Sequence, residues 1–228
     1  MNAFRFRITA ALVACILLAV TQPALAKKEK PPQTSHDGLE LVQGSKADIA
    51  YLLPNADMSG YSRVMLLEPH IAFKKNWKRD HNRAAVNRVT DRDMARMIER
   101  GKDLFTHVFT DELEEGGYPV VHEPGQDVLL VRPAIINLDV AAPDVGAGRT
   151  YTYTASAGEA TLYIELYDSV TGQILVRALD RKADRDTDLR WTMSRNRSTN
   201  THDARRALRH WAGLLVKALD RSKNNKLE

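Results

Sequence analysis

The sequence is poor in the residues and motifs that mark common catalytic sites. One cysteine in 228 residues excludes an intramolecular disulfide and a zinc site built from several cysteines. HExxH and GxSxG patterns are both absent, so neither the zincin motif nor the nucleophile elbow occurs. Neither charge sign dominates, since 33 Lys and Arg oppose 29 Asp and Glu for a formal net charge of +4. The composition is that of an ordinary globular protein and assigns no reaction.

The N-terminus has the layout of a secretory signal peptide. Arg5 and Arg7 precede a stretch of apolar and small residues, Ile8–Val20, and the small-x-small pattern from Ala24 to Ala26 follows. The apolar stretch is shorter than the roughly 20 residues of a transmembrane helix, and no later stretch approaches that length. We therefore predict export to the periplasm, cleavage after Ala26, and no membrane span in the mature chain.

A second interpretation of the same segment is a lipid anchor. The residues Leu12-Val13-Ala14-Cys15 match a bacterial lipobox, which would place a lipid on Cys15. Against this, the apolar run continues after Cys15 to Val20. Cleavage after Ala26 instead removes the cysteine with Arg5 and Arg7, and lowers the formal net charge to +2. Either way the protein belongs to the envelope, where we expect no nucleic-acid partner.

Composition shifts divide the chain into a signal peptide and one domain. Residues 1–26 are the expected signal peptide, and 27–37 are an expected flexible tether because they are rich in charge and proline. Residues 38–222 form the expected domain, and 223–228 a frayed tail.

Two amphipathic helices are expected in the domain. The first begins at the capping-box pattern Thr90–Asp93 and ends at Gly116-Gly117, with Phe105 and Phe109 in the core and Gly101 at a close contact with the sheet. The second begins near Thr201–Asp203.

Several strands are expected around these helices. One strand, Arg63–Phe73, is interrupted at Pro69. The others span 118–122, 127–140, 151–157, and a hairpin made from 162–167 and 173–180. The order predicts an α+β fold, a single domain with a mostly antiparallel sheet and two long helices packed on one face.

Three segments resemble a known bacterial family. They are His36–Val42 (HDGLELV), Tyr61–Leu66 (YSRVML) and Glu165–Leu175 (ELYDSVTGQIL). On these residues the chain is similar to domain of unknown function 3313, a family of candidate lipoproteins, over roughly residues 36 to 220. The resemblance implies an envelope protein, often lipid-anchored, with no established activity or catalytic residues to carry over.

Metal and cofactor sites are not predicted. Asp184, Asp186 and Asp188 alternate as in a calcium loop, but Leu189 and Arg195 stand where that loop needs glycine and glutamate, so we interpret the segment as solvated. The seven histidines are scattered and show no ligand spacing. No cofactor is expected, although a Ser-His-Asp triad from distant parts of the chain stays open.

Basic residues gather around two tryptophans, an arrangement that suits anionic surfaces. The candidate binding residues in these two clusters are Lys74, Lys75, Trp77, Lys78, Arg79, Arg190 and Trp191. The leading hypothesis is therefore a non-enzymatic binding or accessory domain whose partner is an envelope protein or an anionic envelope surface. The alternative hypothesis is a small periplasmic hydrolase with its site in Asp184–Thr199.

Overall fold

A computed structural model describes residues 30–84, 88–140, 152–153, 158–183, 194–195 and 197–224. The chain divides into two units, Met1–Lys30 and Pro31–Glu228, and every helix and strand below lies in the second. The expected signal peptide, its cleavage residues Ala24 and Ala26, and Cys15 lie outside the described residues.

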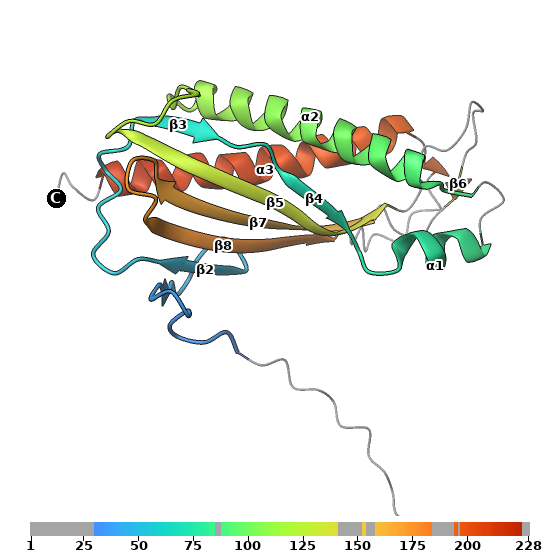
Figure 1. Ribbon diagram of the computed structural model, residues 1–228, viewed down its shortest axis with the longest axis horizontal. Coiled ribbons are helices and arrows are strands. Elements are labelled where there is room, and N and C mark those ends of the chain that lie inside the picture. Colours follow the sequence, from blue (N-terminus) through green and yellow to red (C-terminus); the bar gives the residue numbers. More distant parts are fainter. Residues whose placement is uncertain are drawn as a thin grey trace, which may run out of the picture. The chain divides into compact units, whose positions relative to one another are not determined.

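The second unit contains a seven-stranded sheet in the order β1-β2-β8-β7-β5-β3, with β4 also paired to β5 (Figure 1). All pairs are antiparallel except β3 and β4, which run parallel to β5. The strands are β1 Glu40–Leu41, β2 Ile49–Leu52, β3 Arg63–Leu66, β4 His70–Phe73, β5 Val128–Val140, β7 Gly158–Asp168 and β8 Ile174–Ala183. A separate pair joins β6 (Thr152–Tyr153) to β9 (Ser194–Arg195). The predicted α+β, mostly antiparallel single domain is confirmed.

The interruption predicted at Pro69 is also confirmed. Both β3 and β4 pair with β5, β3 from Val128 to Val131 and β4 from Ala134 onward. Pro69 lies between the two strands and is fully buried. Proline has no N–H to donate to a strand ladder, so the break falls where pairing cannot continue.

Three helices complete the described fold: α1 (Trp77–Ala84), α2 (Asp91–Glu115) and α3 (Arg197–Asn224). The capping box predicted for α2 is present, because the Thr90 side chain accepts from the Asp93 backbone N–H and the Asp93 side chain accepts from that of Thr90. The helix ends at Gly116, as predicted, and Gly117 takes a positive φ of 81° that glycine adopts without strain.

The structure differs from the sequence prediction in three elements. The segment containing α1 showed no apolar periodicity, and the helix was therefore not predicted. The strand expected at Tyr118–His122 is only an isolated bridge from Val120 to Val64. The last helix begins at Arg197, before the expected start near Thr201–Asp203, and continues through Asn224 into the expected tail. Its first turn is polar, so apolar spacing could not indicate it.

The core joins both long helices to the sheet. Phe105 and Phe109 on α2 have no exposed surface, and their rings stack with centroids 3.9 Å apart, as the predicted core positions require. They share one apolar cluster with Trp211 of α3 and Ile164 of β7. The close contact predicted at Gly101 is present, because a Cβ there would lie 2.8 Å from Cδ1 of Ile71 on β4.

Candidate functional site

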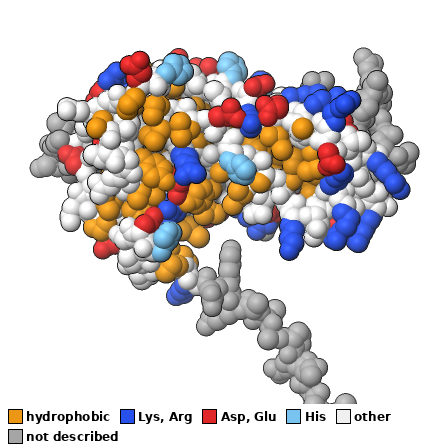
Figure 2. All heavy atoms as spheres, viewed as in Figure 1, with side chains coloured by type: hydrophobic (Ala, Val, Ile, Leu, Met, Phe, Trp, Pro, Cys, Tyr) orange, Lys and Arg blue, Asp and Glu red, His pale blue; other side chains and the backbone are white. Residues whose placement is uncertain are grey.

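The first candidate site is the basic segment, residues Lys74–Arg83, which directly follows β4 and contains most of α1. Its cations extend into solvent, with 58% of the Arg79 side chain and 70% of the Arg83 side chain exposed. Lys74 and Lys75 are also exposed, immediately before the helix. Lys and Arg side chains gather at this end of the molecule in Figure 2. The segment therefore presents its positive charge to the solvent.

Trp77 packs the basic segment against the sheet. Only 5% of Trp77 is exposed, and its ring stacks on Phe73 at 4.5 Å and on His81 at 5.4 Å between centroids. Its Nε1 donates a hydrogen bond to Oδ1 of Asp139 on β5 at 3.1 Å. Trp77 thus attaches α1 to the sheet, and among the predicted contact residues of this segment its cations, not Trp77, are available to a ligand surface.

The charge of the basic segment is partly balanced by carboxylates. Its ion pairs join Lys74 to Asp139 (3.5 Å), Lys78 to Asp91 (2.7 Å), Arg79 to Asp80 (3.0 Å) and Arg83 to Asp80 (3.6 Å). Such exposed pairs are weak and leave the side chains free to exchange partners. Lys75 has no ion pair with any described residue. Burial lowers the pKa of His81, so this histidine is neutral near pH 7 and adds no charge.

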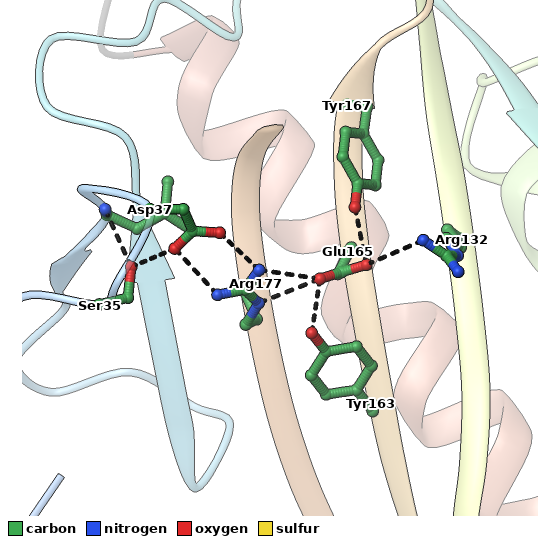
Figure 3. A network of polar contacts seen from close by, with 8 residues as sticks. Ser35, Asp37, Arg132, Tyr163, Glu165, Tyr167 and Arg177 are labelled. Carbon is green, nitrogen blue, oxygen red and sulfur yellow. Dashed lines mark hydrogen bonds and ion pairs between the residues drawn. The ribbon is translucent and has the colours of Figure 1, made fainter. Parts of the chain in front are cut away.

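A second polar cluster lies on β7 and β8 and was not predicted (Figure 3). Glu165 on β7 is its centre, with 8% of its side chain exposed. The carboxylate accepts hydrogen bonds from the hydroxyls of Tyr163 (2.5 Å) and Tyr167 (2.7 Å). Arg177 on β8 donates to it from Nε and Nη2, at 3.1 and 3.0 Å. Tyr163, Glu165 and Tyr167 share a face because they alternate along β7, and strand register places Arg177 opposite Glu165.

The same Arg177 also binds the segment expected to be a tether. Its Nη1 and Nη2 donate to Asp37 Oδ1 and Oδ2 at 3.0 and 2.6 Å, and Ser35 Oγ donates to Asp37 as well. The Tyr51 hydroxyl donates to the carbonyl of Pro32. Residues from Pro32 to Asp37 are therefore hydrogen-bonded to the domain, and residues 27–29 of the expected tether lie outside the described residues.

Both carboxylates of the cluster are held in the ionised form. Hydrogen bonds from Arg177 and Ser35 hold the pKa of Asp37 well below its usual range. Burial raises the pKa of Glu165, but the hydrogen bonds from Tyr163, Tyr167 and Arg177 outweigh it, so the pKa is lowered. A general acid or base needs a pKa near the working pH. The cluster is accordingly suited to holding structure together and poorly suited to proton transfer.

The remaining predicted site residues fall outside the described part of the chain. These are Arg190 and Trp191 of the second basic cluster. Asp184, Asp186 and Asp188, which we did not predict to form a metal site, also lie outside the described part. Most of the segment assigned to a hydrolase site lies outside it too. Within the described residues, no three His, Cys, Asp or Glu side chains form a group that could hold a metal ion. No described helix combines the length and the apolar character needed to cross a membrane.

Comparison with known proteins identifies a family. No curated protein matches the sequence. Among solved structures, the PelC dodecamer from Paraburkholderia phytofirmans is similar at 11% identity, covering 70% of this chain and 94% of that chain with a TM-score of 0.34. A "putative lipoprotein" from Caulobacter crescentus CB15 is similar at 13% identity, covering 74% and 96% with a TM-score of 0.38. The model of the family described as "Protein of unknown function (DUF3313)" matches residues 34–215, and the chain therefore belongs to this family.

Proposed function

We propose that this chain is an exported protein of the bacterial envelope, and that it acts as a binding domain that contacts an anionic lipid surface through the basic segment. Export is supported by the pattern from Arg5 to Ala26. Surface binding is supported by one observation above all: the cations of α1 are exposed, while Trp77 fixes the helix to β5.

The expected interaction is weak and reversible. A basic side chain close to an anionic membrane contributes about 1 kcal/mol, and the attraction falls off within a Debye length. The carboxylates of Asp80, Asp91 and Asp139 oppose part of this attraction. The segment also lacks exposed aromatic side chains that could enter the lipid, since Trp77 is buried. Binding should therefore depend on charge alone, and should be absent on neutral lipid.

The proposal is tested by co-sedimentation with vesicles of phosphatidylglycerol and phosphatidylcholine, compared with vesicles of phosphatidylcholine alone. The test variant reverses three exposed cations, Lys75→Glu, Arg79→Glu and Arg83→Glu. The control variant makes the same change in net charge elsewhere, with Lys46→Glu, Lys217→Glu and Arg221→Glu, all exposed. We expect the test variant to lose binding to the anionic vesicles and the control to retain most of it. Equal losses in both variants would contradict a site at the basic segment.

A further inference from the structure

The sheet has a second face whose side chains lie away from the apolar core. On β7, Leu162, Ile164 and Leu166 belong to the core, so the alternating residues Tyr163 and Glu165 point to the opposite face. Residues paired across neighbouring strands share a face. This outer face therefore also carries the partners of those residues, which are Arg132 and Ala134 on β5 and Arg177 and Leu179 on β8.

The outer face combines apolar side chains with a polar centre. Leu130 and Ile136 on β5 lie on it, as the partners of Tyr167 and Thr161, and both are half-buried. In Figure 1, β5, β7 and β8 pass in front of α3, and Figure 2 is drawn from the same side. Hydrophobic side chains spread across this region in Figure 2, around a few charged ones. Tyr and Arg among apolar residues are the composition typical of energetically important protein contacts.

Arg132 is a strongly exposed cation at the centre of this face. Its side chain is 66% exposed, and its Nη1 lies 3.8 Å from Oε2 of Glu165, beyond hydrogen-bond distance. Glu165 already accepts from Tyr163, Tyr167 and Arg177. The long ion pair with Glu165 uses only part of the planar Arg132 guanidinium, which carries five N–H donors. The exposed remainder of this side chain can meet a further carboxylate.

We propose that the outer face docks a partner protein that places a carboxylate on Arg132 between apolar side chains. Charge complementarity selects the carboxylate: the Arg132 side chain is 66% exposed, and it shares the Glu165 carboxylate with Arg177. A carboxylate matches the guanidinium in a two-bond geometry. The apolar surroundings favour a protein over a lipid surface. Anionic lipid headgroups bind where several cations gather, and apolar side chains such as Leu130 and Ile136 do not strengthen their binding. The sheet offers this surface with a rigid backbone, so little reorganisation is needed on binding.

The test is site-specific photo-crosslinking in cells of the native host, with p-benzoylphenylalanine replacing Leu130 in the full chain. We expect an adduct with one protein, and the crosslinked peptide should contain Asp or Glu beside apolar residues. Arg132→Glu should reduce the adduct about tenfold or more, because like charges then face each other. Reversing the partner's acidic residue to Arg should restore it. Arg221→Glu, which makes the same change in net charge at an exposed position on α3, should leave the adduct intact.

Several results would overturn this inference. One such result is a yield of adduct from p-benzoylphenylalanine at Leu130 that is no higher than from the same residue at Thr106, an exposed position on α2. An adduct that survives Arg132→Glu, or one formed with lipid or with a second copy of this chain, would do the same. Because Arg132 is exposed, Arg132→Glu should fold, and its urea unfolding midpoint verifies this. Arg132→Gln is a second variant, which removes the charge without reversing it. Vesicle binding by the basic segment does not involve Arg132, so either proposal can fail while the other holds.

Discussion

The guanidinium of Arg177 on β8 makes two hydrogen bonds with the carboxylate of Asp37, which lies 140 residues earlier in the chain. The same guanidinium donates twice to Glu165 on the neighbouring strand. One side chain thus joins the N-terminal segment to the middle of the sheet. This contact holds the segment from Ser35 to Asp37 against the sheet.

Replacing Arg177 should destabilise the protein more than replacing Asp37. Arg177→Ala leaves the buried Glu165 carboxylate without its two closest cationic donors, and removing one partner of a buried pair costs about 3–5 kcal/mol of the free energy of unfolding. Asp37→Ala leaves the contact between Arg177 and Glu165 in place and should cost less. Urea unfolding measures the free energy of unfolding of both variants, with Arg221→Ala, at an exposed position on α3, as the control. A loss below about 0.5 kcal/mol for Arg177→Ala would show that the cluster is dispensable.

The stability should fall in acid, in part because of Asp37. Its pKa in the folded protein is depressed below the ordinary value of 3.8 by hydrogen bonds from Arg177 and Ser35. A depressed pKa stabilises the fold at pH values above the ordinary pKa. That stabilisation is lost as the pH falls toward the pKa of the folded state. Asp37→Asn should flatten this acid decline of the free energy of unfolding. Glu123→Gln, at an exposed position, should leave the slope as in the wild type.

The apolar face of α2 supplies a third prediction. Phe105→Ala or Phe109→Ala should lower the free energy of unfolding by about 3–5 kcal/mol, because each ring is fully buried and its removal leaves a cavity. Thr106→Ala, exposed on the same helix, should change it by less than about 0.5 kcal/mol. Denaturant melts of the three variants measure these differences. Similar melts for all three would mean that the α2 contacts are not needed for stability.

Patterned elements could be predicted from the sequence, and elements made by long-range contacts could not. The apolar spacing and capping residues of α2 indicated both of its ends, and strict alternation indicated the β7–β8 hairpin. In α1, a single large apolar side chain, Trp77, carries the packing, so no period exists to detect. The Glu165 cluster depends on strand register and on Asp37, which sequence alone places in a polar linker. The basic segment was visible in the sequence, but the burial of Trp77 beneath it was not.

Export can be decided from the intact mass of the protein isolated from its native host. We expect a chain beginning at Lys27, because cleavage after Ala26 follows the small-x-small pattern. A chain beginning at Cys15 with added acyl groups would support the lipid anchor in its place. A full-length chain beginning at Met1 in the cytoplasmic fraction would contradict export in either form.

The central claim is that exposed cations of the basic segment bind anionic lipid, and the salt dependence of vesicle binding tests it most directly. Raising the ionic strength from about 0.01 M to about 1 M shortens the Debye length from about 30 Å to about 3 Å. We predict that wild-type binding to phosphatidylglycerol vesicles falls steeply over this range. We also predict that the variant with Lys75→Glu, Arg79→Glu and Arg83→Glu shows little binding at any salt concentration. Binding that is unchanged by salt and equal in both proteins would contradict the account.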